Sequence, residues 1–153
     1  MKILIVGLGV QGQKRKKLLN KRLIFATVDT KNKNADFKNI KDVPLNKYDS
    51  VFVCTPDSEK LKILNYCIKY KKNALIEKPL VANSERKIRK LETEANRKNL
   101  VFYSAYNHRF EPHFINIKKI IKSKVLGKIY YCHLFYGNGT AKLVRNNKWR
   151  DKG

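Results

Sequence analysis

The chain has 153 residues, of which 35 are Lys or Arg and 12 are Asp or Glu, and its formal net charge is +23. This length suffices for one well-buried domain, and because no apolar run could span a bilayer and no signal peptide precedes the first strand pattern, we expect a cytoplasmic protein without a membrane partner. The cations are spread along the whole chain without interleaved aromatic residues, which favours salt-sensitive, non-specific binding over a specific nucleic-acid function.

The first predicted element is a buried strand at residues 2–6, which leads directly into the turn Gly7-Leu8-Gly9-Val10-Gln11-Gly12. A lysine-rich helix is expected from about Val10 to Asn20. Three glycines at this spacing are typical of a dinucleotide site. The first makes a tight turn, the second lets the backbone approach the pyrophosphate, and the third lets the helix pack closely on the strand. A glycine-rich loop without a ligand is the alternative.

A second strand pattern at residues 23–28 ends at Asp29. In dinucleotide-binding domains an acidic residue about twenty residues after the glycine turn accepts hydrogen bonds from the adenosine ribose. Such a carboxylate repels a 2′-phosphate, so it favours NAD. Thr30, Lys31 and Lys33 follow it, however, and could accommodate that phosphate, so NADP stays open. The alternative for Asp29 is a turn residue, since Asp often ends strands.

Strand and helix patterns continue to alternate along the chain. The expected strands are residues 37–40, which form at most a short one, 50–54, 74–76, 100–104 and the aromatic segment 128–136, and the expected helices are residues 59–70 with Ser58 as N-cap, 84–98 and 112–122. This order predicts an α/β fold, a Rossmann doubly wound parallel sheet with right-handed crossovers. Cys54, Cys67 and Cys132 lie in apolar runs without a CxxC pair and are expected to be reduced and buried.

Lys78 lies in Glu77-Lys78-Pro79, directly after an expected strand. When a carbinol loses hydride to a nicotinamide, its oxygen gains negative charge, which a nearby ammonium group stabilises. A lysine fixed between an acid and a rigid proline suits that task, although it could also be one of many lysines in a turn. His108 could act as an acid or base, but a packing or exposed role is favoured. His113 and His133 have no metal-ligand spacing, so no metal site is expected.

Six motifs occur in a characteristic order: the glycine turn, Cys54-Thr55-Pro56, Glu77-Lys78-Pro79, Asn107-His108-Arg109-Phe110 with Pro112, Gly127-Lys128-Ile129 and Trp149-Arg150. Together they resemble the glucose-fructose oxidoreductase and inositol dehydrogenase family, also called Gfo/Idh/MocA, over nearly the whole chain. The resemblance implies an NAD(P)-dependent oxidoreductase acting on the CH–OH group of a sugar, inositol or nucleotide-linked sugar. It places the Rossmann domain at 1–105 and, at 106–153, a linker helix and the first strand of a truncated α+β open-sheet domain.

The resemblance also implies roles for single residues. The pyrophosphate would lie over the turn from Gly9 to Gly12, and the adenosine ribose would contact Asp29. Cys54, Thr55 and Pro56 would flank the dinucleotide at the carboxyl edge of the sheet, Glu77 and Lys78 would lie near the nicotinamide ribose and ring, Asn107 and Arg109 would lie beside the nicotinamide, and Trp149 with Arg150 would cover the cofactor.

Members of the family continue with a glycine-rich turn and an Asp-x-x-x-His motif that supplies a proton-transfer histidine, and this chain reaches Gly153 before either. Two function classes stay open. One is the cofactor half of a sugar-type dehydrogenase, inactive alone and either truncated or completed by another chain; the other is a non-catalytic NAD-binding module. Downstream DNA that encodes the missing motif would favour the first. The unpaired aromatic strand predicts self-association, which light scattering would detect.

Overall fold

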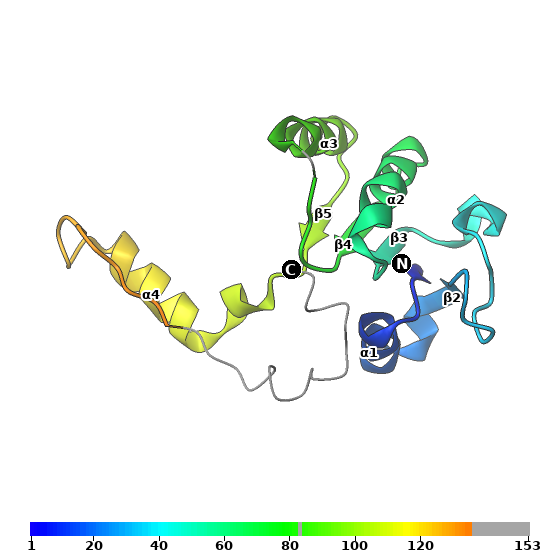
Figure 1. Ribbon diagram of the computed structural model, residues 1–153, viewed down its shortest axis with the longest axis horizontal. Coiled ribbons are helices and arrows are strands. Elements are labelled where there is room, and N and C mark those ends of the chain that lie inside the picture. Colours follow the sequence, from blue (N-terminus) through cyan, green and yellow to red (C-terminus); the bar gives the residue numbers. More distant parts are fainter. Residues whose placement is uncertain (83, 136–153) are drawn as a thin grey trace. The chain divides into compact units, whose positions relative to one another are not determined.

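The computed structural model describes residues 1–82 and 84–135, and in these ranges strands and helices alternate along the chain (Figure 1). The strands are β1 (Ile3–Val6), β2 (Ile24–Val28), β3 (Ser50–Val53), β4 (Asn73–Ile76) and β5 (Phe102–Ser104). The α-helices are α1 (Val10–Leu18), α2 (Asp57–Lys69), α3 (Glu85–Arg97) and α4 (Pro112–Lys122). The chain divides into two compact units, Met1–His108 and Arg109–Gly153.

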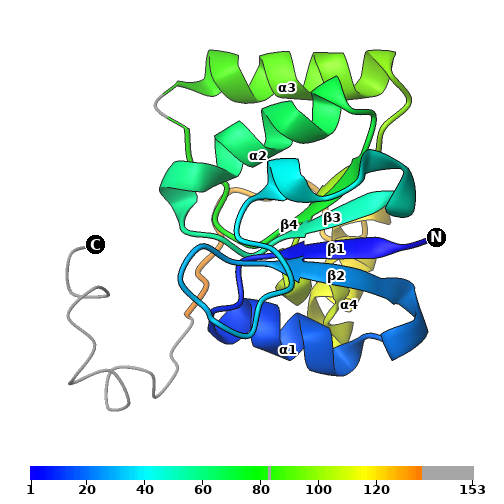
Figure 2. The same ribbon diagram turned by 90° about the vertical axis from the view of Figure 1, so that its right-hand side faces the viewer.

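The first unit contains one parallel sheet with the strand order β2-β1-β3-β4-β5. Helices α2 and α3 cover one face of this sheet and α1 covers the other (Figure 2). Strand β1 is buried on both faces: Leu4 and Val6 pack into the core beneath α2, while Ile3 and Ile5 pack into a smaller cluster on the opposite face. A strand buried on both sides reads as a continuous apolar run, and the predicted doubly wound α/β fold is confirmed.

The segment between β2 and β3 is shorter and more polar than a full strand-helix unit. The strand expected at residues 37–40 is reduced to a single bridge between Phe37 and Val28. Before Phe37, Asp36 accepts hydrogen bonds from the backbone N–H and the hydroxyl of Thr27, at 2.7 and 2.6 Å, and so replaces a backbone partner; after it, Asn39 caps a 3-10 helix at Ile40–Asp42 that ends the pairing. The hydroxyl bond from Thr27 is the main cause that lowers the pKa of the Asp36 carboxyl.

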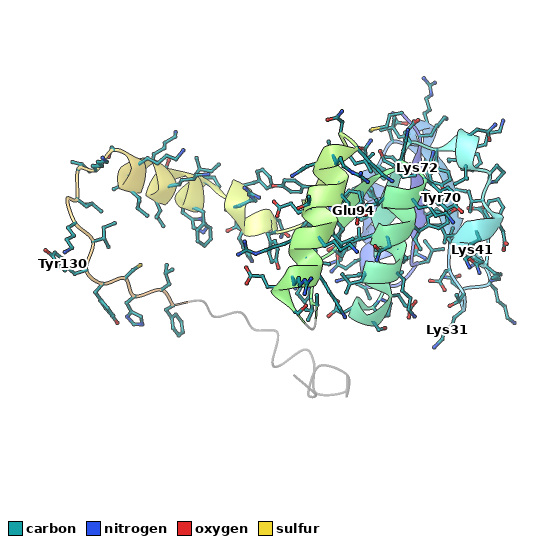
Figure 3. The ribbon with its side chains drawn as sticks, turned by 90° about the horizontal axis from the view of Figure 1, so that it is seen from above. Lys31, Lys41, Tyr70, Lys72, Glu94 and Tyr130 are labelled. Atoms are coloured by element: carbon teal, nitrogen blue, oxygen red, sulfur yellow. The ribbon has the colours of Figure 1, made fainter. Side chains whose placement is uncertain are left out.

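Tyr48 closes the core at the end of this segment and is almost fully buried. The Lys72 ammonium lies 4.7 Å from the centre of the Tyr48 ring and donates to the backbone carbonyl oxygens of Leu45 and Tyr48, at 2.6 Å each. Figure 3 shows Lys72 beside Tyr70, at the end of α2. A lysine here thus joins the end of α2 to the loop before β3, which fixes where β3 enters the sheet.

Helix α2 begins one residue earlier than the capping residue expected for it. Its N-terminal flanking residue is Pro56, and Ser58 lies within the first turn without a capping bond, so the prediction of Ser58 as N-cap is wrong. Pro56 has the fixed φ of proline, here −55°, which leads the chain into the helix without an added cap. Asp57 and Glu59 place negative charge in the first turn, where the helix dipole favours it.

In the second unit, α4 has the predicted bounds. Residues 128–135 contain no strand, which corrects the expected aromatic strand over its described part. A strand requires a backbone partner, and none pairs with this segment in the part of the chain that the structure describes. For the same reason Cys132 is exposed rather than buried as expected, whereas Cys67 is buried and Cys54 is partly so. Among the described residues no helix is both long enough and apolar enough to cross a membrane.

Candidate dinucleotide-binding site

The strand register brings four chain segments to one edge of the sheet. Val6 pairs with Val28 on one side and with Val53 on the other, and Val53 pairs with Ile76. The segments that follow these strands therefore form a row at the carboxyl edge, where open α/β sheets bind their ligands. That row contains most of the residues singled out in the sequence: the glycine turn, Asp29, Cys54 with Thr55 and Pro56, and Glu77 with Lys78.

Two glycines of the turn are required by the protein itself. Gly7 has a φ of +93°, and a Cβ added to it would lie 2.6 Å from the Cys54 carbonyl oxygen. Gly12 is buried, and a Cβ there would overlap the Gly7 carbonyl oxygen. The turn is also tied to the neighbouring strand, since the Gly7 N–H donates to the Val28 carbonyl oxygen at 2.8 Å. These contacts explain why α1 can lie so close to the turn and to Cys54.

The middle glycine is different, because the fold does not need it. Gly9 lies at the N-cap position of α1 with an extended backbone, is exposed, and would have no atom within 4 Å of an added Cβ. It also offers no side chain to cap the helix. The space beside Gly9, at the N-terminus of α1 where the first N–H groups have no partner within the helix, is therefore clear of protein atoms. This arrangement fits an anionic group such as a pyrophosphate.

Asp29 fixes the glycine turn from the end of β2. One carboxylate oxygen accepts the Leu8 N–H at 2.7 Å, and the other accepts those of Lys31 and Asn32, at 2.9 and 2.8 Å. Burial by itself would raise the pKa of Asp29, but the bonds from Leu8, Asn32 and Lys31 outweigh it and hold the pKa below its ordinary value. The carboxylate is therefore charged at neutral pH. Asp29 therefore stabilises the turn that follows β2, and its carboxylate oxygens still keep a lone pair that can accept a hydrogen bond from a hydroxyl group.

The residues after Asp29 are open to solvent. Thr30 and Lys31 are both exposed, and Figure 3 shows Lys31 on the loop that follows β2. Nothing in the loop holds the Lys31 ammonium toward the glycine turn among the described contacts.

The end of β3 contributes a buried hydroxyl and a thiol. The Oγ1 atom of Thr55 is inaccessible to solvent and has no hydrogen-bond partner in the described residues, a costly state that a bound ligand could relieve. Burial, and then the negative charge of Glu77, raises the pKa of the Cys54 thiol to about 12. Cys54 is therefore a neutral packing residue at neutral pH rather than a nucleophile, and Pro56 beside them is exposed.

The end of β4 is held by two cations that the sequence interpretation missed. Glu77 is only 8% exposed, and its Oε1 accepts a hydrogen bond from Nε of Arg15 at 2.7 Å, with a second guanidinium nitrogen at 2.6 Å. The Lys60 ammonium, on α2, donates to the carbonyl oxygen of Pro79 at 2.6 Å. Lys78 lies between these two contacts and is exposed. The sequence features that could have singled out these two cations were weak. Arg15 lies one turn after Gly12 within a run of lysines, and Lys60 lies on the apolar stripe of α2.

The remaining predicted residues follow β5 in the chain, whose last residue, Ser104, pairs with Ile76 at the same edge, or they lie outside the described ranges. Asn107 and Arg109 are exposed and belong to a 3-10 turn at Asn107–Phe110, which crosses the boundary between the two units. Their roles beside a nicotinamide stay predictions. Trp149 and Arg150 lie outside the described residues.

Comparison with known proteins agrees with this geometry. The profile of the Gfo/Idh/MocA family, an oxidoreductase family with an NAD-binding Rossmann fold, matches residues 1–106. Inositol 2-dehydrogenase 1 of Saccharopolyspora erythraea is 26% identical over 93 residues, which are 61% of this chain and 28% of that protein. Inositol 2-dehydrogenase 2 of the same organism is 27% identical over 90 residues, or 59% of this chain and 26% of that protein.

Solved structures share the fold. A crystal structure of myo-inositol 2-dehydrogenase from Lactobacillus plantarum aligns with a TM-score of 0.67 and 22% identity, covering 84% of this chain and 42% of that protein. A crystal structure of apo scyllo-inositol dehydrogenase from Lactobacillus casei aligns with a TM-score of 0.69 and 20% identity, covering 84% of this chain and 43% of that protein. The chain thus spans less than half the length of the relatives it matches.

Proposed function

The chain belongs to the Gfo/Idh/MocA oxidoreductase family, whose Rossmann fold binds NAD, and from this premise we propose that its glycine turn and Asp29 bind NAD(H). The observation that carries the proposal is the open space at Gly9. The fold needs glycine at positions 7 and 12 for its own packing, but at position 9 glycine leaves the N-terminus of α1 clear for a ligand. Backbone N–H groups and the helix dipole both favour a pyrophosphate there.

The other groups at the carboxyl edge complement the rest of a dinucleotide. The charged Asp29 carboxylate would accept a hydroxyl of the adenosine ribose, while its bonds to Leu8, Lys31 and Asn32 keep it fixed. The buried Thr55 hydroxyl would gain a partner from the ligand. The family resemblance and the position of these residues at the carboxyl edge of the sheet support these roles. The same two observations support Cys54 and Pro56 as residues that flank the dinucleotide.

Titration calorimetry tests the proposal. We expect one NADH site in the full chain and weaker binding of NADPH, because Asp29 repels a 2′-phosphate. Asp29→Asn keeps an amide oxygen for the loop N–H groups but removes the charge, so the preference for NADH should fall about ten-fold, equivalent to roughly 1.4 kcal/mol. Asp42→Asn, which removes an exposed charge from a nearby turn, is the matched control. An unchanged preference in Asp29→Asn would leave Asp29 as a turn residue alone, and no heat with either nucleotide at millimolar concentration would refute NAD(H) binding.

We further propose that the chain is the cofactor half of an oxidoreductase acting on the CH–OH group of an inositol or related sugar, as the names of its relatives suggest. Bound NAD would accept the hydride from the carbinol carbon. The Lys78 ammonium, exposed at the end of β4, would stabilise the negative charge that develops on the carbinol oxygen. Glu77, with one carboxylate oxygen bonded to Arg15, would present the other to the nicotinamide ribose.

Catalysis by this chain alone is expected to be very weak. The curated relatives are more than twice as long, and acid–base catalysis, which contributes about a hundred- to ten-thousand-fold, is a task assigned to none of the described residues. Mixed with NAD and myo-inositol, the chain should produce NADH at a rate near background, as followed at the absorbance of NADH. Robust turnover that Lys78→Ala abolishes would contradict this expectation and show that this chain suffices for catalysis. A chain that binds NADH but gains no activity with any completing partner would be a binding module.

We also propose that the chain self-associates. The support comes from apolar side chains exposed in and after α4 rather than from a strand edge. They are Ile120, Ile121, Val125, Leu126, Leu134 and Phe135. Burying such side chains between copies removes apolar area from water.

A further inference from the structure

Two helices on opposite faces of the sheet each place a cation on the Glu77-Lys78-Pro79 segment. Arg15 of α1 binds the Glu77 carboxylate, and Lys60 of α2 binds the Pro79 carbonyl oxygen. The residue between the two contacts is Lys78. We infer that Arg15 and Lys60 are positioning residues that hold Lys78 and Glu77 against the nicotinamide end of the dinucleotide. The inference rests on the proposed NAD(H) site, and it gives a role to Arg15 and Lys60, which have no other role in that site.

The ion pair of Arg15 and Glu77 is partly buried, with side-chain exposures of 29% and 10%. Charges in such a place interact more strongly than charges on an open surface, because less water screens them. Both contacts are made to Oε1, so this carboxylate oxygen is held against α1 while Oε2 remains an acceptor for a hydroxyl. Since the N-terminus of α1 is the proposed pyrophosphate site, Arg15 ties the two halves of the dinucleotide site together.

Lys60 is the more unusual of the two residues, because its side chain is 2% exposed and is charged. It lies on the same stripe of α2 as Ile63 and Leu64, which are buried apolar residues. An apolar residue would fill this place without the cost of burying an ammonium group. That cost is offset by Asp57 Oδ1 and by the Pro79 carbonyl oxygen, each 2.6 Å from Nζ. A buried cation kept on an apolar stripe, and directed at the backbone beside Lys78, indicates a role for that backbone.

The consequence is that the backbone at Lys78 is held in place while its side chain is exposed. Lys78 is exposed, but the residues on both sides of it are bonded to separate helices. Its ammonium group can therefore sample only positions near the end of β4, and small displacements of a positioned group lower a rate or an affinity strongly. Loss of either cation should thus weaken the contacts that the site makes with the nicotinamide end of a dinucleotide and leave its contacts with the adenosine end unchanged.

Two ligands separate these ends: NADH, and ADP, which has the same adenosine and pyrophosphate but neither the nicotinamide nor its ribose. We would titrate both into the full-length wild type, Arg15→Met and Lys60→Met, with Lys14→Met as the control, since Lys14 is an exposed cation on the same helix as Arg15. Each of the first two variants should weaken NADH binding about ten-fold and change ADP binding less than about two-fold. Arg15→Lys should recover part of the loss, and Lys14→Met should not distinguish the ligands.

The outcomes separate this inference from the proposed function. If the wild type binds both ligands but Arg15→Met and Lys60→Met weaken both equally, Arg15 and Lys60 act on the fold or on the net charge, and the inference is overturned. If the wild type binds neither ligand, the NAD(H) site itself is wrong and the inference falls with it. If a methionine variant loses its folded circular dichroism signal, Arg15→Gln and Lys60→Gln supply the comparison instead, because each removes the charge but keeps hydrogen-bonding atoms in place, and the same two results decide.

Discussion

Gly9→Val is expected to abolish NADH binding and to leave the chain folded. A valine Cβ at this position meets no protein atom within 4 Å, so the fold tolerates it. The branched side chain would instead fill the space in front of the first turn of α1, where the pyrophosphate is proposed to bind. Losing two charge-assisted hydrogen bonds at about 1.5 to 2 kcal/mol each would weaken binding at least about a hundred-fold. Calorimetry with NADH, alongside circular dichroism, measures both parts of the expectation.

An ordinary NADH affinity in a folded Gly9→Val protein would show that the pyrophosphate does not lie on α1. Gly9→Ala provides a graded comparison, since its single methyl group occupies less of the same space. We expect its affinity to fall between those of the wild type and the valine variant.

The same substitution one turn later should have the opposite result. Gly12→Val places a side chain on the Gly7 carbonyl oxygen, with the Cys54 side chain 3.5 Å away. The obstacle is backbone rather than a flexible side chain, so α1 must move away from the turn. Overpacking of this kind costs about 1 to 3 kcal/mol and at times more. We therefore expect Gly12→Val to lower the free energy of unfolding by at least about 3 kcal/mol. Urea denaturation followed by circular dichroism measures this loss.

Gly9→Val is the matched control for that experiment, because both variants add the same atoms to one helix. If Gly12→Val were as stable as Gly9→Val, the close packing of α1 on the turn would not be needed for the fold. The pair thus separates a glycine kept for a ligand from a glycine kept for the protein.

The centre of the sheet could be predicted because its strands β1 and β3 are largely buried on both faces. Strand β1 is a continuous apolar run followed by the glycine turn, and β3 has the apolar run of residues 51–53 followed within three residues by Pro56. Helix α4 was equally predictable, since a proline opens it and apolar residues recur at helical spacing. In these elements the local pattern and the tertiary environment favour the same structure.

The failures concern features that depend on a partner elsewhere in the chain. The aromatic segment at residues 128–135 has every local preference of a strand, yet it is not one, because strand formation requires backbone hydrogen bonds from another segment. The predicted burial of Cys132 failed with it. Phe37 shows the same dependence on a smaller scale: one bridge to Val28 forms, and the Asp36 side chain takes the place of the next partner.

The sequence by itself determined the α/β fold, the glycine turn and Asp29, because each is a short pattern whose meaning is contained in neighbouring residues. Only the tertiary structure decided that, of the three glycines in the turn, Gly9 faces open space, that Asp29 holds Leu8, and that Arg15 and Lys60 hold the segment around Lys78. Arg15 and Glu77 lie 62 positions apart, and Lys60 and Pro79 lie 19 apart. Among 35 Lys and Arg residues, the local signals that mark these two are weak, since a cation acquires such a role only when folding removes it from water and places a partner beside it.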